Sequence, residues 1–84
     1  MVNREIEVEL AGGLEARAIA MMVQIACQYD SQIYMQYRDK RVNAKSIMGM
    51  LSLGVALSDT VNLSAEGADE EEAMQALENY LKGE

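Results

Sequence analysis

Three short segments of the chain alternate strictly between polar and apolar residues. Residues 5–10 alternate glutamate with aliphatic residues, and residues 32–37 and 60–65 repeat the same period of two. Because successive side chains of a strand point to opposite faces, this period predicts strands that bury one face and expose the other. Such strands favour an antiparallel sheet with one face on a core and one in water. The inward residues are expected to be Ile6, Val8, Leu10, Ile33, Met35, Tyr37, Val61, Leu63 and Ala65.

Two longer segments carry apolar residues at helical spacing. One runs from Ala16 to Cys27, and the other follows Asp69, the expected N-cap, with Glu72 as its capping-box partner. Cys27 is expected to pack in the core as a small apolar group. The apolar stripes are Ala16, Ile19, Ala20, Val23, Ala26 and Cys27 in the first helix, and Ala73, Met74, Leu77, Tyr80 and Leu81 in the second.

A hairpin and a short helix complete the order of elements. Residues 38–41 form a polar turn before a short return strand that starts at Val42, and a short helix follows Ser46. The order strand, helix, strand, strand, helix, strand, helix predicts one α+β domain over residues 1–84. We expect an open-faced sandwich, with a four-stranded antiparallel sheet and three helices on one face.

The size and charge of the chain argue against several classes of function. Eighty-four residues, 50% of them hydrophobic, supply one core but no deep catalytic cleft, so an enzyme is not expected. Seven bases against fourteen acids give a net charge of -7, whereas binding to nucleic acid requires an excess of bases. Three bases, Lys40, Arg41 and Lys45, lead into Ser46 and favour an acidic partner surface there.

The cysteine and histidine content bears on metals and on cell compartment. One cysteine and no histidine predict neither a disulfide framework nor a metal site, and no cofactor is expected. No N-terminal stretch has the pattern of a signal peptide, and no apolar run approaches membrane-spanning length. We therefore expect a cytoplasmic protein that does not contact a membrane.

The middle of the chain, residues 42–53, has the features of a docking site. Ser46 suits an N-cap, and Ile47, Met48, Met50 and Leu51 follow it within little more than one helical turn. A surface helix buries only one stripe, so some of these side chains should face water, and Met48 is the one expected to be most exposed. A phosphate on Ser46 would lie at a helix N-terminus, where negative charge is stabilised. Taken in isolation, Ser46 is read as a simple N-cap rather than as a phosphorylation site.

Two segments resemble signatures of the bacterial phosphocarrier family HPr. Asn43-Ala44-Lys45-Ser46-Ile47-Met48-Gly49, followed by Leu51-Ser52-Leu53, is similar to the regulatory-serine segment of that family. Gly13-Leu14-Glu15-Ala16-Arg17 is similar to the other signature, in which a histidine stands between the leucine and the alanine. Glu15 occupies that place here. The chain therefore resembles the Crh branch of the family, the catabolite-repression paralogues that keep the serine and lack the histidine.

The resemblance implies the HPr fold and a role for Ser46 as the site of phosphorylation by HPr kinase/phosphorylase with ATP. It also implies that Ile47, Met48 and Leu51 form a docking surface of the kind used with enzyme I, the kinase and the transcription regulator CcpA. Ordinary packing of Ile47 or Leu51 in the core is the alternative. Arg17 and Lys45 would contact an acidic partner or the added phosphate, although Arg17 fits a plain solvated arginine equally well.

Glu15 removes the function that the family histidine performs. In HPr the histidine accepts phosphate from phosphoenolpyruvate through enzyme I, which requires an imidazole nitrogen as nucleophile. Glu15 could instead be a favourable charge at a helix start, an acyl-phosphate acceptor, or a carboxylate held near Arg17 that imitates phosphohistidine. Free N–H groups at this start form an anion-pocket candidate with Gly13, Ala16 and Arg17.

We therefore expect a non-enzymatic regulatory protein of carbon catabolite repression, phosphorylated on Ser46 and unable to carry phosphohistidine. Its partner would be a CcpA-type transcription regulator or a metabolic enzyme. The alternative is a component of the phosphotransferase system that modulates or competes at enzyme I and the sugar transport proteins, or a degenerate phosphocarrier paralogue.

Overall fold

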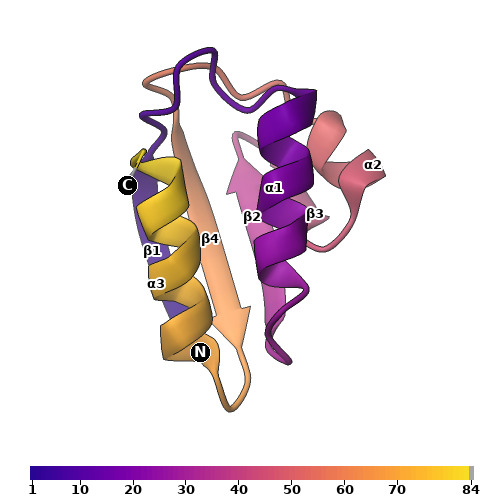
Figure 1. Cartoon of the computed structure of the whole chain (residues 1–84), viewed down its shortest axis with the longest axis vertical. Helices are drawn as coiled ribbons and strands as arrows, with labels where there is room; N and C mark the ends of the chain where they lie inside the picture. The colour runs from indigo at the N-terminus through magenta and orange to yellow at the C-terminus, as the bar shows by residue number, and fades with distance from the viewer. Residues whose placement is uncertain (84) are drawn as a thin grey trace.

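Four strands form one antiparallel sheet in the computed structural model, which describes residues 1–83 (Figure 1). The strand order across the sheet is β1-β4-β2-β3, so the N-terminal strand pairs with the last one. The predicted α+β class, element order and antiparallel sheet are confirmed. The elements are β1 (Val2–Glu7), α1 (Ala16–Ala26), β2 (Gln32–Tyr37), β3 (Lys40–Asn43), α2 (Ile47–Leu51), β4 (Thr60–Glu66) and α3 (Glu70–Leu81).

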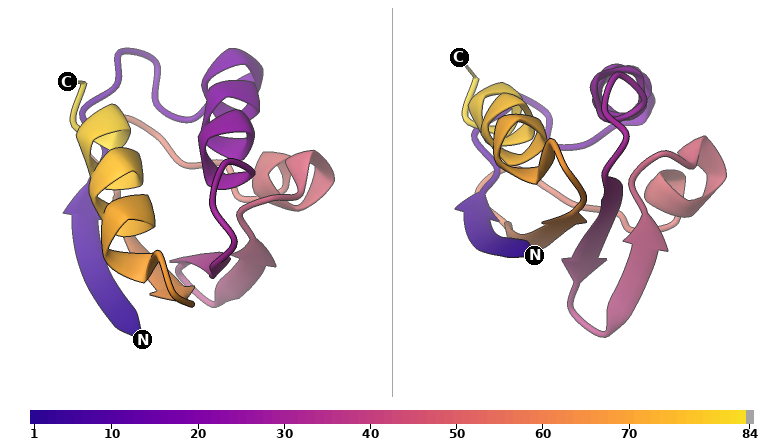
Figure 2. Two further views of the ribbon diagram at one scale, coloured as in Figure 1. Left: turned by 60° about the horizontal axis from the view of Figure 1, so that its bottom comes forward. Right: turned by 90° about the horizontal axis from the view of Figure 1, so that it is seen from below.

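The three helices cover one face of the sheet and leave the other face open (Figure 2). Helix α3 packs on β1, β4 and α1, while α2 packs between α1 and β3. All three predicted rows of inward strand residues lie in the core, except that Leu10 is only partly buried. The longest helix has 12 residues, and within the described part of the chain no helix has the length and apolarity needed to cross a membrane.

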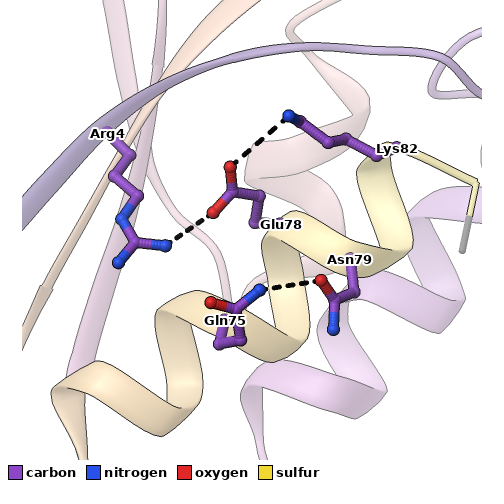
Figure 3. A network of polar contacts seen from close by, with 5 residues as sticks. All are labelled: Arg4, Gln75, Glu78, Asn79 and Lys82. Carbon is purple, nitrogen blue, oxygen red and sulfur yellow. Dashed lines mark hydrogen bonds and ion pairs between the residues drawn. The ribbon is translucent and has the colours of Figure 1, made fainter.

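An ion pair joins β1 to the helix above it (Figure 3). Arg4 Nη1 lies 2.6 Å from Glu78 Oε1 on α3, and Lys82 Nζ lies 3.7 Å from the other carboxylate oxygen. Glu78 is mostly shielded, with 19% of its side chain exposed. The pair therefore fastens the edge strand to α3 in a partly desolvated setting, where it is less screened than an exposed pair.

The first strand is shifted toward the N-terminus from its predicted position. It ends at Glu7 because its partner β4 begins at Thr60, and the chain beyond pairs with a loop instead. Val8 N–H donates to the Asp59 carbonyl (2.9 Å), and the Val8 carbonyl accepts from Ser58 N–H (2.8 Å). The alternating pattern thus continues past the strand, which explains why it predicted residues 5–10.

Predictions about both helices were partly wrong. Ala16, Ala20 and Cys27, which were expected in the apolar stripe of α1, are all exposed. Cys27 is exposed and caps the C-terminus of α1, because it lies roughly 80° around the helix axis from Ile19 at 3.6 residues per turn. Met22 occupies the core instead. The capping box at α3 does not form: Asp69 is the N-cap without a side-chain bond to its own helix, and Glu72 is exposed.

The Asp69 carboxylate joins the loop before β2 to the start of α3. It accepts hydrogen bonds from Asp30 N–H (2.9 Å), Ser31 N–H (3.0 Å) and the Ser31 hydroxyl. The Ser31 hydroxyl, and next the Asp30 N–H, lower the pKa of Asp69. Close packing at this junction requires glycine at position 67, where an added Cβ would lie 2.6 Å from Ser31 Oγ.

Candidate functional site

Ser46 is the N-cap of α2, as predicted. Its backbone is extended, and its Oγ accepts a hydrogen bond from Gly49 N–H at 3.2 Å. The preceding residues form a tight turn in which Asn43 Oδ1 accepts from Lys45 N–H and the Asn43 carbonyl accepts from Ser46 N–H. Gly49 leaves room for the cap, because an added Cβ there would lie 3.3 Å from Val42 Cβ and 3.4 Å from Ser46 Oγ. Ser46 is half-buried, so the hydroxyl is held but not sealed from solvent.

An exposed apolar surface lies directly beside this serine. Ile47, Met48 and Leu51 are 48%, 79% and 45% exposed, whereas Met50 is 1% exposed and belongs to the core. We call the three exposed residues the α2 patch. Met48 is the most exposed of them, as predicted, and neither Ile47 nor Leu51 packs fully in the core. Apolar side chains grouped at one spot next to a helix start are typical of a protein-binding surface.

The start of α1 is held by backbone contacts to the loop before β4. Gly12 and Gly13 both have positive φ, of 83° and 70°. Gly13 is buried against that loop, where an added Cβ would meet the Val55 carbonyl oxygen at 2.7 Å. Leu14 N–H donates to the same carbonyl at 3.0 Å. The segment that carries Glu15 is therefore held in place by Val55 and Ala56, and sequence patterns did not predict these contacts.

A hydrogen bond between Tyr37 and Asp59 holds the supporting loop to the sheet. The Tyr37 hydroxyl donates to Asp59 Oδ2, which also accepts from Ala56 N–H at 2.9 Å. The first of these bonds lowers the pKa of Asp59 and raises the pKa of Tyr37. Alternation placed Tyr37 correctly on the inward face, but nothing in the sequence joined it to an aspartate 22 residues away.

Glu15 is the N-cap of α1, but its side chain makes no capping hydrogen bond. The carboxylate lies over Gly12, since an added Cβ on that glycine would be 3.6 Å from Glu15 Oε2. Among residues 1–83, no ion pair within 4.0 Å joins Glu15 to Arg17. Gly13 N–H donates to the Leu10 carbonyl at 2.9 Å, so it is not a free donor for an anion. Of the anion-pocket candidate, Ala16 and Arg17 remain, both exposed in the first turn.

The two lysines near Ser46 are both directed to backbone carbonyls. Lys45 Nζ donates to the Tyr29 carbonyl at 2.7 Å, beyond the C-terminal end of α1. Lys40 Nζ donates to the Ser52 carbonyl at 3.1 Å, at the C-terminal end of α2. Neither ammonium therefore lies free beside the serine hydroxyl. Lys45 would have to leave Tyr29 before it could contact a phosphate on Ser46.

Further exposed apolar side chains were not predicted as part of any site. Met21 on α1 is 42% exposed, and Leu57 in the loop before β4 is 52% exposed. Met21 lies in a helix that packs on α2, and it is adjacent in sequence to the buried Met22. Leu57 lies in a loop, where no periodic pattern reports exposure.

Comparisons with known proteins agree with this arrangement. A family model described as "PTS HPr component phosphorylation site" matches residues 2–83. The HPr-like protein Crh of Halalkalibacterium halodurans is 45% identical over the full length of both chains. The HPr-like protein Crh of Bacillus subtilis is 44% identical, covering all of this chain and 99% of that protein.

Solved structures give the same relation. The crystal structure of HPr-C-His from Thermoanaerobacter tengcongensis matches with a TM-score of 0.93 and 48% identity, over all of this chain and 98% of that one. A crystal structure of Bacillus subtilis Crh matches with a TM-score of 0.80 and 44% identity, over all of this chain and 97% of that one. That Crh structure is described as an intertwined dimer with a swapped domain.

Proposed function

Since the chain belongs to the HPr family, we propose that it is a cytoplasmic regulatory protein, phosphorylated on Ser46 by HPr kinase/phosphorylase and active through protein binding. Membership in the family, with Crh proteins among its relatives, places the chain among HPr-like regulatory proteins of the phosphotransferase system and catabolite repression. The observation that supports the finer proposal is the position of the Ser46 hydroxyl at the edge of the exposed α2 patch.

Phosphorylation would change the charge of this surface without a change of fold. Transfer of the γ-phosphoryl group of ATP to Ser46 Oγ forms a phosphate ester, releases ADP and gives the hydroxyl proton to the kinase. The added group carries about -1.5 to -2 charge near pH 7 and three strong acceptor oxygens. Because these oxygens would stand next to apolar side chains, a partner needs an apolar groove with cations at one end.

The cations that read the phosphate should come mainly from the partner. Lys45 is engaged with the Tyr29 carbonyl, and Lys40 with the Ser52 carbonyl. A CcpA-type transcription regulator or a metabolic enzyme with its own arginines would then distinguish the phosphorylated from the unphosphorylated form. Arg17, exposed on the first turn of α1, is a candidate contact for acidic groups on the same partner.

The second part of the proposal is that the chain does not carry phosphate as a phosphohistidine. The 84-residue sequence contains no histidine, and Glu15 stands at the start of α1 where the family signature has one. A carboxylate lacks the imidazole nitrogen that takes part in phosphate transfer in HPr. Regulation through Ser46 would thus be separated from phosphate transport.

Incubation with ATP and HPr kinase tests the main proposal. The protein should gain one phosphate by mass, and Ser46→Ala should abolish this gain. Ser52→Ala is a matched control, because Ser52 is an exposed serine at the other end of the same helix. Phosphate added to Ser46→Ala, or no phosphate on wild type with a kinase that modifies HPr, would contradict the proposal. Incubation with phosphoenolpyruvate and enzyme I should leave the chain unlabelled.

Binding to a CcpA-type regulator tests how the site acts. Phosphorylated protein should bind more tightly than unphosphorylated protein, and Met48→Ser should weaken binding in the phosphorylated state. Met21→Ser is the control, because it changes an exposed methionine outside the patch. Equal affinity of the two phosphorylation states would contradict a switch at Ser46.

One observation favours the second candidate function, modulation of the phosphotransferase system at enzyme I. The α2 patch is exposed in the unmodified chain, so it is available for docking without any phosphate. In that case unmodified protein should slow phosphate transfer from enzyme I to HPr, and Met48→Ser should restore the rate. An unchanged transfer rate at high excess of the protein would exclude this candidate.

A further inference from the structure

The open face of the sheet carries a hollow of about 240 Å³, on the side away from the helices. It is formed mainly by outward-facing residues of β2, β3 and β4, which alternate with the core residues of the same strands, together with Met1 and the core residue Ala65. Helix α2, which begins after Ser46 and carries the α2 patch, belongs to the layer of helices (Figure 2). The lining residues are Met1, Gln32, Tyr34, Arg41, Ser64, Ala65 and Glu66.

Ser64 on β4 contributes a hydroxyl to the lining of the hollow. The residue is only 8% exposed, yet within residues 1–83 no buried side-chain oxygen lacks a hydrogen-bond partner, so this hydroxyl is not an orphaned buried group. Ser64 stands in register with Tyr34 on one side and Asn3 on the other. The small side chain between two larger ones lies low in the hollow. The Ser64 hydroxyl reaches solvent in the hollow, where it can donate to or accept from a bound molecule.

Arg41 supplies preorganised donors at the same hollow. Its guanidinium carbon lies 4.3 Å from the centroid of the Tyr34 ring, a stacked arrangement. In the part of the chain that the structure describes, no carboxylate lies within 4.0 Å of this guanidinium. Stacking orients the plane of the group and leaves its edge N–H donors free for a planar oxyanion.

The chemistry of the lining selects one class of ligand. Arg41 already occupies a face of the Tyr34 ring, which disfavours a sugar stacked there. Glu66 and Gln32 face each other across β4 and β2, so the hollow also offers a carboxylate acceptor and an amide. A ligand that satisfies all of these groups has an oxyanion for Arg41 and hydroxyl or amino groups for Glu66 and Gln32.

We propose that this hollow binds a small organic anion, with a carboxylate or phosphate on Arg41 and the Ser64 hydroxyl, and hydrogen-bond donors toward Glu66. The site is independent of Ser46 and of its phosphorylation. It would give the protein a second input, a metabolite sensed on the sheet face while partners dock on the helix face.

Amide NMR spectra of the full chain, titrated with inorganic phosphate and separately with citrate at constant ionic strength, test the proposal. Citrate carries carboxylates and a hydroxyl, whereas inorganic phosphate carries only the phosphate group. The two titrations therefore show whether the hollow prefers a carboxylate or a phosphate. We expect saturable shifts at Gln32, Tyr34, Arg41, Ser64 and Glu66 with at least one probe. Shifts that grow linearly, or that concentrate at α1 and α2, would overturn it.

Two arginine variants form a matched pair for the same titration. Arg41→Gln should weaken binding at least about tenfold, because it removes the charged donors from the oxyanion. Arg38→Gln removes an equal charge from another arginine that stacks on a tyrosine, 5.0 Å from the centroid of the Tyr37 ring. Arg38 lines a different hollow. Arg38→Gln should change the affinity by less than about twofold, since exposed charges at a distance are screened. Equal loss in both variants would reduce the effect to general electrostatics and refute the site.

Ser64→Ala completes the test because it removes the hydroxyl that lines the hollow and leaves every charge in place. Affinity should fall by a smaller factor than in Arg41→Gln, and the remaining shifts should keep the same pattern. Each variant must first show the dispersed amide spectrum of the folded protein. Wild-type affinity in Ser64→Ala would remove the hydroxyl from the proposed site.

Discussion

Helices α1 and α2 each begin at an N-cap residue, but the two starts are stabilised in different ways. Ser46 caps its helix through a side-chain hydrogen bond to Gly49, and an apolar patch surrounds it. Glu15 caps its helix by backbone position alone, and its segment is fixed by contacts to Val55 and Ala56. One start is held through its own side chain, and the other through its surroundings. A helix start can therefore lose the residue that performed its chemistry, provided that its backbone support remains.

The backbone support of α1 gives the largest expected effect. Gly13→Ala combines a positive φ with a Cβ 2.7 Å from the Val55 carbonyl, and should lower the free energy of unfolding by about 3 kcal/mol. Gly54→Ala is the control, because Gly54 has φ +69° and no atom within 4 Å of the added Cβ. Gly54→Ala should lower the free energy of unfolding by only about 1 kcal/mol. Equal losses in urea unfolding would show that residues 55–56 do not support the start of α1.

The pH profile of stability separates the two starts further, because only the α1 support contains titrating groups in contact. The folded-state pKa of Asp59 is lowered by the Tyr37 hydroxyl, so this stabilisation is present above about pH 4 and is lost as the pH falls through the folded pKa. The pKa of Tyr37 is raised, so the stabilisation is also lost as the pH rises above about 10.

Asp59→Asn should flatten the stability profile at both ends, measured as urea midpoints at acid, neutral and alkaline pH. The pKa values of Asp69 and Glu70 are also lowered, so part of the loss of stability at acid pH should remain in this variant. Asp39→Asn is a suitable control, since the carboxylate of that exposed turn residue makes no hydrogen bond within the described residues. An alkaline limb unchanged in Asp59→Asn would contradict the role of the Tyr37 bond.

The cap at α2 gives a smaller and more local effect. Ser46→Ala should lower the free energy of unfolding by about 1 kcal/mol, because the Gly49 N–H loses its acceptor. Ser46→Asp should restore most of this loss, since aspartate caps as well as serine does. Hydrogen exchange should place the change at α2 rather than at α1. An equal loss in both variants would show that the side-chain cap contributes nothing.

The smallest expected effect on stability is that of Glu15→Gln. The Glu15 carboxylate makes no capping hydrogen bond, so the free energy of unfolding should change by less than about 0.5 kcal/mol. The informative measurement is the affinity of this variant for a partner. If Glu15 imitates the charge of a phosphohistidine, affinity for enzyme I or the regulator should drop, whereas equal affinities would remove that hypothesis.

Short-range patterns predicted most of the fold. Alternation identified the inward residues of β2 and β4, and the serine before an apolar run identified the cap of α2 and the exposure of Met48. Both depend on neighbours within one turn or one strand. The family resemblance placed Glu15 and Ser46, and the structure confirmed that each residue begins a helix.

Contacts between distant segments could not be predicted in the same way. The capping box at α3 fails because Asp69 binds the loop before β2 instead. In the hairpin turn the left-handed residue is Arg38, with φ 59°, a position that the polar turn pattern does not single out. Cys27 was assigned to the core because the predicted stripe of α1 was rotated about the helix axis: Ala16 and Ala20 are exposed with Cys27, whereas Ala18 and Met22 are buried. Each error arises where a tertiary partner or a small rotation decides between two patterns that look alike.

The strand order has a consequence for how the chain is made and folded. Strand β1 has a single neighbour, β4, whose residues follow it by more than fifty positions. During synthesis β1 must therefore remain unpaired until β4 has also been made. Closing so long a loop before any ladder bond forms slows folding, so β1 should be the last strand to pair.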